Sequence, residues 1–507
     1  MRKRQTVDLL VVGGGINGAG ICREAAGRGL RALLVEQGDL AGFTSSASTK
    51  LIHGGLRYLE HLEFRLVREA LAERERLLNI APHIVRPLRF VLPHATGLRP
   101  LWQIRLGLFL YDHLGGRKRL SPSRQIRLSA DPAGLPLKPQ FVHGFSYADC
   151  WVDDCRLVVL NARDAASRGA EVLTRTQLKS ARSEADGWVA ECIDLQGRRL
   201  EVHARALVNA TGCWVESVRQ AVGLPGSHPV RLVQGSHIVV TRLYEGPQAY
   251  LLQNPDRRVV FVIPFEEHFT LIGTTDVPFH GELGQVRISP AEITYLCESV
   301  NRYFNRTVSS ADIRWSYSGV RALQEDEEAD ASNVTRDYDL KLERSASGPP
   351  ALTIIGGKIT TYRRLAEAAL AVLRPFVGGR EGHWSAEVAL PGGDIPEGDL
   401  PRYLTVCQTR WPFIPRGVLA RLVHSYGTQL ERILEGCAST ADLGEHFGAG
   451  LTAAEVNHLL QREWALTAED ILWRRSKLGL HVPAEGVARL DKYLNRVLAE
   501  RPTEATL

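Results

Sequence analysis

The chain has 507 residues, of which 44% are hydrophobic and 23% charged, a composition typical of a globular protein and not of a disordered one. Its length predicts two or three domains, because one hydrophobic core rarely serves so long a chain. The 62 basic and 57 acidic residues leave a net charge of only +5, which does not indicate nucleic-acid binding. Basic patches could still favour anionic small molecules or an anionic membrane surface.

Cysteine usage and the N-terminal residues narrow the class of protein further. The eight cysteines form no CxxC pair and no Cys/His metal spacing, so we expect reduced thiols, a cytoplasmic chain and no metal site. The apolar run after the basic residues 1–4 is interrupted by Asp8 and then by glycines, which fails the pattern of a signal peptide. No apolar stretch reaches eighteen residues, so no transmembrane helix is expected.

The chain opens with a predicted strand–helix–strand unit. Residues 8–12 form a short apolar strand, residues 16–28 a helix, and residues 31–36 a second strand after Gly29. Short apolar strands on both sides of a helix are typical of a parallel sheet that is buried on both faces.

The turn between the first strand and the helix carries the pattern Gly13-x-Gly15-x-x-Gly18. The first glycine allows the tight turn, the second lets the backbone approach a diphosphate, and the third lets helix and strand pack closely. Glu36 ends the second strand, where a carboxylate can accept both hydroxyls of an adenosine ribose. The unit therefore predicts a bound dinucleotide, and by itself leaves FAD and NAD open.

A hydroxyl-rich loop follows the second strand. Thr44, Ser45, Ser46, Ser48 and Thr49 precede Lys50 in this segment, which we call the hydroxyl loop. A nicotinamide-type fold has no need of such a loop, whereas its hydroxyls and cation could bind further phosphate and the ribityl chain of FAD. The alternative is a solvated Ser/Thr loop.

The rest of the chain alternates between sheet-forming pieces and long insertions. We predict a helix at 157–168, a strand at 171–176 and an antiparallel meander around Asp186-Gly187 and Gln196-Gly197 that ends at 206–212. A further strand at 352–355 runs into Gly356-Gly357 and a helix from about residue 360. We expect a discontinuous cofactor domain (1–80, 150–225 and 313–375), a substrate domain (81–149 and 226–312) and a helical C-terminal domain (390–507).

Residues 99–114 form the most apolar segment of the chain, with Arg105 and Asp112 on one side of the predicted helix. A buried core helix explains this pattern at least as well as a helix lying in a membrane interface. The basic residues 117–119 beside it would suit interfacial binding.

Seven blocks of the sequence closely resemble the FAD-dependent glycerol-3-phosphate dehydrogenases of bacterial respiration, in order and over nearly the whole chain. They are GGGING (13–18), KLIHGGLRYLEH (50–61), YADCWVDD (147–154), QGSH (234–237), GTTD (273–276), YSGVR (317–321) and GGKIT (356–360). The resemblance implies an α/β fold: a Rossmann-like FAD-binding domain of the D-amino-acid-oxidase/glutathione-reductase type, an α+β substrate domain and an all-α C-terminal domain. It also implies oxidation of sn-glycerol 3-phosphate to dihydroxyacetone phosphate, with electrons passing to a membrane quinone.

Such a substrate needs cations at its phosphate end. Arg57 and Arg321 lie in the matching blocks, and guanidinium groups bind phosphate through two parallel hydrogen bonds. Arg258 is a third candidate, and Tyr58 could donate to the phosphate or merely pack.

The hydroxyl proton of the substrate must also leave, which suits a histidine. His53 is the predicted catalytic base and His237 the predicted orienting residue; with Arg321 they form the predicted catalytic set. Lys358 is expected at the substrate and, with the start of the late helix, at the flavin pyrimidine, where positive charge would stabilise the reduced cofactor. The predicted FAD-binding residues are Gly13, Gly15, Asn17, Gly18, Glu36, Thr44, Ser45, Ser46, Lys50, Leu51, His53, Ala210, Thr211, Gly212, Gly357, Lys358 and Thr360.

Two other functions stay open at this point. An oxidase would carry out the same oxidation with O2 and release hydrogen peroxide, and a flavin-containing binding factor would carry out no oxidation. The expected location is the cytoplasm, at the inner face of the cell membrane. The C-terminal domain has no evident catalytic motif, and the role expected for it is packing or the formation of a homodimer.

Overall fold

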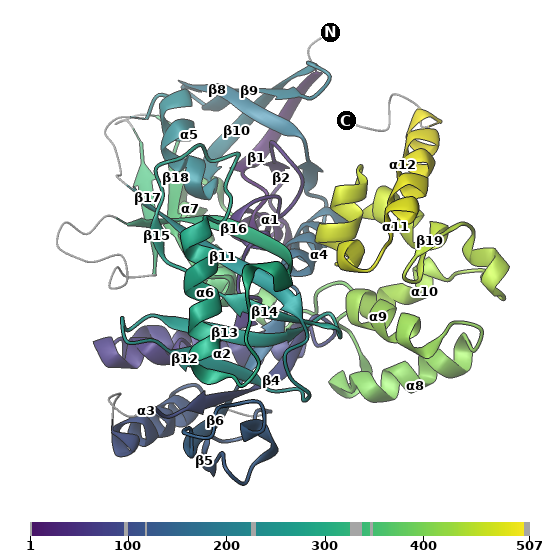
Figure 1. Ribbon diagram of the computed structural model, residues 1–507. Coiled ribbons are helices and arrows are strands. Elements are labelled where there is room, and N and C mark those ends of the chain that lie inside the picture. Colours follow the sequence, from purple (N-terminus) through teal and green to yellow (C-terminus); the bar gives the residue numbers. More distant parts are fainter. Residues whose placement is uncertain are drawn as a thin grey trace.

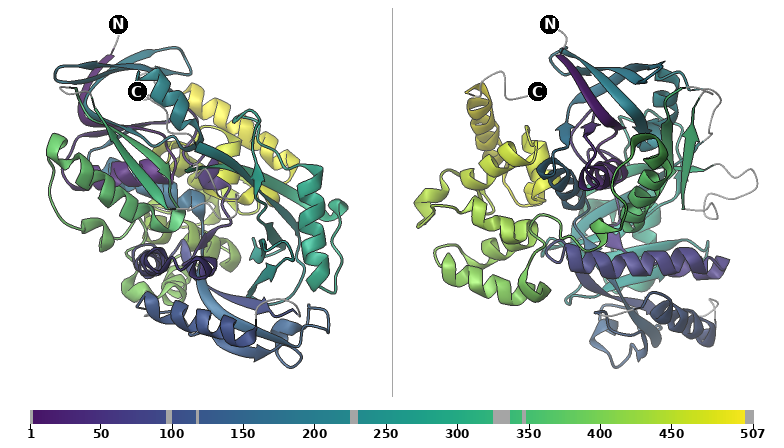
Figure 2. Two further views of the ribbon diagram at one scale, coloured as in Figure 1. Left: turned by 90° about the vertical axis from the view of Figure 1, so that its left-hand side faces the viewer. Right: turned by 180° about the vertical axis from the view of Figure 1, so that it is seen from behind.

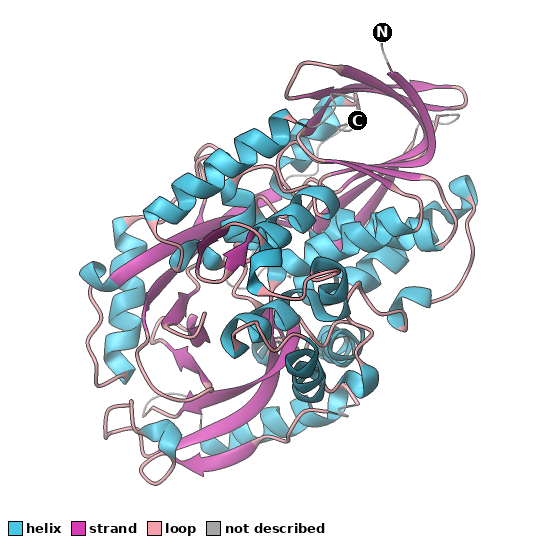
Figure 3. Cartoon of the chain, turned by 90° about the vertical axis from the view of Figure 1, so that its right-hand side faces the viewer, coloured by secondary structure: helices cyan, strands magenta, loops and turns pink. Residues whose placement is uncertain are grey.

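Two large sheets and a helical C-terminal unit make up the computed structural model (Figure 1). It describes residues 3–95, 100–116, 119–224, 230–324, 337–344 and 348–500. Figure 3 separates the strands of the two sheets from the helices that pack on them.

The first sheet contains the predicted strand–helix–strand unit. Its path is β17 (Tyr338–Glu343), β18 (Ala351–Gly356), β10 (Arg199–Asn209), β1 (Lys3–Val12), β2 (Ala32–Val35) and β7 (Glu171–Leu173). The strand β1 runs parallel to both β10 and β2, and β18 runs parallel to β10. The strands β8 (Thr176–Glu184) and β9 (Gly187–Asp194) continue antiparallel from β10, which confirms the predicted meander.

Apolar side chains of this sheet are buried on both faces. On one face Leu9 and Val11 pack with the helices α1 (Ile16–Gly27), α4 (Asp154–Ser167) and α7 (Tyr362–Val377). On the other face Leu10 packs with Trp188 of the meander. Burial on both sides explains why these strands are continuous apolar runs and not alternating ones.

The second sheet is built largely from the two predicted insertions. Its path is β15 (Val277–Pro278), β11 (Val230–Thr241), β14 (Phe269–Gly273), β13 (Val259–Phe265), β12 (Ala249–Gln253), β4 (Val85–Pro93), β6 (His143–Val152) and β3 (Leu51–Ile52), with β16 (Ile313–Gln324) on β11 and β5 (Arg124–Arg127) on β6. One face packs on α6 (Pro290–Tyr303), and the other packs on α2 (Phe64–Ile80) and α3 (Leu101–Leu114).

The strand β16 falls within 313–375, the range that the sequence assigned to the cofactor unit. It pairs along its length with β11, and β3 likewise pairs with β6 of the second sheet. We therefore propose that residues 313–324 belong with the substrate unit and that the cofactor unit resumes at β17.

The apolar segment forms α3, and it is only half buried. Ile104, Leu108 and Tyr111 lie in the core beneath the second sheet. Trp102, Leu106 and Phe109 are exposed at 69%, 51% and 55% of their surfaces. The helix therefore buries one apolar face in the core and exposes a second set of apolar side chains. Within the described residues, none of the helices is both long and apolar enough to cross a bilayer.

The C-terminal unit is helical apart from one short hairpin and lies to one side of both sheets, next to α4 (Figures 1 and 2). It has its own hydrophobic core. Its elements are α8 (Leu400–Arg410), α9 (Arg416–Tyr426), α10 (Leu430–Ile433), β19 (His446–Gly448), β20 (Leu451–Thr452), α11 (Ala453–Arg462), the short π-helix η11 (Asp470–Arg475) and α12 (Ala484–Ala499).

Candidate active site

A long cavity of about 490 Å³ is lined by residues of both sheets. We call it the long pocket. Most of the residues predicted to contact the cofactor line it: Gly13, Gly15, Asn17, Glu36, Thr44, Ser45, Leu51, His53, Ala210, Thr211, Gly212, Gly357, Lys358 and Thr360. Of the predicted substrate residues, Tyr58, His237, Arg321 and Lys358 line it as well. The predicted residues Gly18, Ser46 and Lys50 lie outside its lining.

The glycine turn is required by close approach of the backbone. Gly13 has a φ of +110°, and a Cβ there would lie 2.6 Å from the carbonyl oxygen of Ala210. A Cβ on Gly18 would lie 1.9 Å from the carbonyl oxygen of Gly13, so Gly18 serves helix packing and not the cavity wall. Ser45 of the hydroxyl loop accepts a hydrogen bond from Ile16 N at 3.0 Å, which ties that loop to the start of α1.

Glu36 lines the long pocket, and its carboxylate is suited to a ribose. Its Oε2 accepts from Gly14 N at 2.5 Å and its Oε1 from Gly38 N at 2.7 Å. Burial raises the pKa of this carboxyl, and the two amide hydrogen bonds oppose the rise. A carboxylate has about four acceptor positions, so about two remain for hydroxyl groups of a ligand.

Lys50 anchors the hydroxyl loop to the start of α4. Its fully buried Nζ lies 2.9 Å from both carboxylate oxygens of Asp154 and donates to Ser46 O at 3.1 Å. Ser48 Oγ donates to Asp154 as well, at 2.7 Å. The expected contact between Lys50 and a ligand phosphate is therefore replaced by an ion pair inside the protein.

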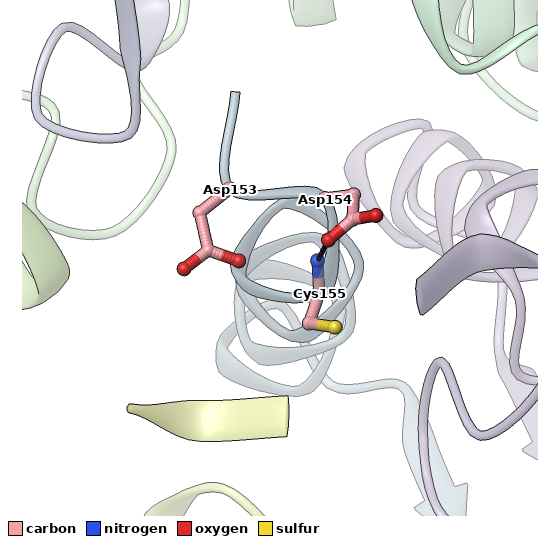
Figure 4. Close-up of side chains that lie close together, drawn as sticks. All are labelled: Asp153, Asp154 and Cys155. Atoms are coloured by element: carbon pink, nitrogen blue, oxygen red, sulfur yellow. Dashed lines mark hydrogen bonds between the residues drawn. The ribbon is translucent and has the colours of Figure 1, made fainter. Parts of the chain in front are cut away.

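Asp153, Asp154 and Cys155 form one group of possible metal ligands among the described residues (Figure 4). Lys477 Nζ lies 2.9 Å from Cys155 Sγ and 3.5 Å from Asp153 Oδ1. Burial alone would raise the pKa of Asp154, but the ammonium groups of Lys50 and Lys477 lower it below its usual value. Two lysine side chains already supply the positive charge at this group, so its donor atoms do not fit a metal site.

Three of the blocks that carry the family resemblance meet on one face of the second sheet. In β11 and β16, His237 pairs with Tyr317 and Val233 with Arg321, so these alternate positions share a face. Gly235 lies between them, and a Cβ there would lie 2.6 Å from Arg321 Nη2.

The Arg321 guanidinium is held by the third block. Its Nη2 donates to Asp276 Oδ1 at 2.6 Å and to Thr275 O at 3.2 Å. Beneath them the buried Glu292 accepts from Ser236 Oγ at 2.7 Å and from Thr275 Oγ1 at 2.6 Å. This network fixes the loop that positions the guanidinium.

The two predicted histidines both line the long pocket, in different surroundings. The His237 ring stacks on Tyr317 at 4.8 Å, and its Nε2 lies 2.9 Å from Thr49 Oγ1. Burial first, and then the positive charges of Lys50 and Arg321, lower the pKa of His237 to about 3. His53 N donates to Thr360 Oγ1 at 3.3 Å, which joins the block after the hydroxyl loop to the start of the late helix.

The segment before α7 also lines the long pocket. Asn17 Nδ2 donates to Gly356 O at 3.1 Å, so α1 and the late block are tied together. Gly356 and Gly357 both have positive φ values, of 71° and 95°. Lys358 Nζ lies 3.8 Å from the centre of the Tyr58 ring, a cation–π contact.

Arg57 and Arg258, the other two arginines predicted to bind substrate, are not among the described residues that line the long pocket. The side chain of Arg57 lies outside the described residues, as do Arg99, Arg117 and Lys118 of the basic segment near α3. Arg258 does not line the long pocket: its Nη2 pairs with Asp256 at 2.7 Å, and its guanidinium stacks over Tyr295.

Sequence reasoning gave no role to Asp154, Asp276 or Glu292. Asp154 and Asp276 lie inside the matched blocks, and an acid so near a predicted cationic site could have suggested ion pairing. Glu292 lies outside these blocks. The pattern of Ser289 and Glu292 indicates a capping box at the start of a helix, and nothing in the sequence links Glu292 to the site.

Comparisons with known proteins agree with this geometry. A family model described as FAD dependent oxidoreductase matches residues 8–363, and one described as the C-terminal domain of alpha-glycerophosphate oxidase matches residues 383–501. The glycerol-3-phosphate dehydrogenase of Pseudomonas aeruginosa is 51% identical over 499 residues, covering 98% of this chain and 97% of that protein. The D-erythritol 1-phosphate dehydrogenase of Brucella abortus is 49% identical over 498 residues, covering 98% and 99%.

A solved structure gives the same result. The glycerol-3-phosphate dehydrogenase from Bacillus halodurans, complexed with FAD, matches with a TM-score of 0.77 and 26% identity, covering 98% of this chain and 90% of that one. These findings confirm the predicted resemblance, the fold class and FAD as the cofactor. The chain therefore belongs to the FAD-dependent oxidoreductases, in the group that includes the glycerol-3-phosphate dehydrogenases.

Proposed function

We propose that this enzyme oxidises sn-glycerol 3-phosphate to dihydroxyacetone phosphate and passes the electrons to a membrane quinone. The observation that carries the proposal is that Arg321, Lys358, His53 and His237 all line the long pocket. Cations and a proton acceptor are the groups that a phosphorylated secondary alcohol requires. The names of the nearly full-length relatives support the same substrate class.

We place FAD along the long pocket, with the adenosine at Glu36 and the flavin towards His53 and Lys358. The remaining acceptor positions of the Glu36 carboxylate and the wall of small residues in the glycine turn fit this placement. When bound, FAD supplies the acceptor for the hydride that leaves C2 of the substrate. Lys358 and the start of the late helix would add positive charge at the flavin end.

The side chains then take separate roles. Arg321, oriented by Asp276, binds the substrate phosphate, and Lys358 adds a second positive charge. His53 accepts the hydroxyl proton. His237, whose pKa is lowered to about 3, stays neutral at physiological pH and is a weak base, which supports an orienting role for it.

The polyol attached to the phosphate is the part of the proposal that most needs a test. Relatives of nearly equal identity are named for glycerol 3-phosphate and for D-erythritol 1-phosphate. The decisive experiment mixes the holoenzyme anaerobically with each compound and follows the flavin absorbance. We expect rapid loss of the yellow colour with sn-glycerol 3-phosphate and slow loss with D-erythritol 1-phosphate. The opposite order would assign the four-carbon substrate, and persistent colour with both would defeat the proposal.

The oxidase alternative differs from this proposal only in the electron acceptor. It is supported by the match of the C-terminal region to a domain named for an oxidase. A steady-state assay with a soluble quinone analogue, compared with peroxide release in air, separates the two acceptors. Fast quinone reduction with little peroxide supports the dehydrogenase, whereas peroxide equal to substrate consumed would establish the oxidase.

We further propose that the exposed face of α3 binds an anionic membrane from the cytoplasmic side. Trp102, Leu106 and Phe109 are spaced along one face of that helix, and Arg105 beside them is exposed. Aromatic and basic residues on an exposed helix suit the lipid interface. Co-sedimentation with anionic vesicles should be lost when Trp102 and Phe109 are both changed to Glu.

The control for this experiment is Leu135→Glu, at an exposed apolar residue outside α3. Equal binding by the double variant and the control would refute the membrane proposal. A homodimer stays a prediction, to be checked by light scattering in detergent.

A further inference from the structure

The C-terminal unit lies outside the long pocket but is joined to its walls. None of the described residues beyond position 380 lines the cavity. The segment 470–477 nevertheless makes ion pairs with residues that are neighbours, in sequence, of residues that line the cavity. This segment begins with η11, and π-helical turns occur often at functional sites.

The first of these pairs holds the loop after Glu36. Asp39 is buried, and its carboxylate receives two hydrogen bonds from Arg475, Nη1 to Oδ2 at 2.8 Å and Nη2 to Oδ1 at 2.7 Å. Arg474 Nε donates to the same carboxylate at 2.6 Å. Two residues further on, Ala41 N donates to Gly14 O in the glycine turn at 3.1 Å. The loop between Glu36 and the hydroxyl loop is therefore fastened to the C-terminal unit.

The second pair holds the backbone at residues 175–176, which is hydrogen-bonded to the backbone at residues 36–38. Arg175 makes a partly buried ion pair with Asp470. The backbone of Arg175 donates to Gly38 O at 2.8 Å, and Thr176 N donates to Glu36 O at 2.7 Å. Thr176 lines the long pocket. The segment 470–477 thus contacts two backbone segments beside Glu36, one at Asp39 and one at Arg175.

We propose that the segment 470–477 positions the adenosine end of the FAD site, so that the C-terminal unit sets FAD affinity without touching the cofactor. The inference rests on the placement of FAD in the long pocket. Removing the Arg475 guanidinium takes two hydrogen bonds from the buried Asp39 carboxylate and leaves Arg474 as its remaining arginine partner, so a buried charge is under-compensated. The Asp39 loop then moves to solvate that charge, and it carries Glu36 away from the ribose. Arg475, Arg474 and Asp470 are positioning residues in this account.

The test uses the purified holoenzyme carrying Arg475→Gln. We expect its FAD dissociation constant to rise at least about tenfold, and flavin fluorescence to appear on heating well before the helices unfold. The matched control is Arg421→Gln, which breaks a partly buried pair with Glu455 inside the C-terminal unit. That variant should lose stability but keep its FAD affinity.

A double-mutant cycle with Asp39→Asn sharpens the test, because this change lies outside the C-terminal unit and leaves its core intact. Asp39→Asn alone should weaken FAD binding as Arg475→Gln does, and the double variant should be no weaker than either single variant. Wild-type FAD affinity in Arg475→Gln, equal weakening in Arg421→Gln, or additive losses in the double variant would each overturn the proposal. None of these measurements uses a substrate, so failure of the proposed reaction would leave the result unchanged.

Discussion

Gly235→Ala is the smallest change that should move Arg321 without touching it directly. The new Cβ would lie 2.6 Å from Arg321 Nη2 and 2.7 Å from Thr274 Oγ1. Non-bonded heavy atoms prefer about 3.5–4.0 Å, so the guanidinium must shift by about 1 Å. Both atoms are the ends of side chains and can move, and the backbone oxygen of Thr275, 3.2 Å from the new Cβ, must give by only a few tenths of an ångström, so the fold should tolerate the methyl group. The shift would pull Arg321 from Asp276.

A misplacement of about 1 Å can cost a factor of about 10² in rate, so we expect kcat/KM to fall about 10- to 100-fold. That loss equals about 1.4–2.7 kcal/mol of transition-state stabilisation. The assay is anaerobic flavin reduction over a range of sn-glycerol 3-phosphate concentrations, with FAD content measured in parallel. The control is Gly417→Ala, where a Cβ would meet nothing within 4 Å. Wild-type kinetics in Gly235→Ala with full FAD content would refute the role given to Arg321.

Four further predictions follow from the same structure. His53→Asn should slow flavin reduction at least about 100-fold while His237→Asn mainly raises KM; a His53 variant with a near wild-type rate would reverse the two roles. His83 has its pKa lowered to about 3 by burial, whereas in the unfolded chain it titrates near pH ~6.5. The unfolded state therefore binds the extra proton, stability is lost as pH falls from about 6.5 towards 3, and His83→Gln should reduce this slope by about 1.4 kcal/mol per pH unit in urea denaturation. Asp154→Asn should cost about 3–5 kcal/mol of unfolding free energy, because it removes the carboxylate partner of the buried Lys50, against less than about 1 kcal/mol for the more exposed Asp256→Asn. A chelator should leave activity unchanged, because lysine ammonium groups already pair the acidic residues at the start of α4.

The dinucleotide site and the parallel sheet were predictable from the sequence, because both depend on contacts between residues close together in the chain. The glycine turn and Glu36 follow rules of backbone contact that act within one strand–helix–strand unit, so the dinucleotide site was predictable without the rest of the fold. The continuous apolar runs of β1, β2 and β18 predicted the parallel sheet for the same reason. Identifying the cofactor as FAD, and the family, required the longer sequence blocks, which are too specific to match by chance.

Only the tertiary structure decided which charged groups face a ligand and which face each other. Lys50 and Arg258 looked like ligand cations in sequence, but one is buried against Asp154 and the other pairs with Asp256. The pairing of β16 with the second sheet and the attachment of Asp39 to Arg475 also join residues far apart in the chain. Such contacts depend on packing between distant segments, and no spacing within the sequence encodes the distance between two side chains that meet only after folding.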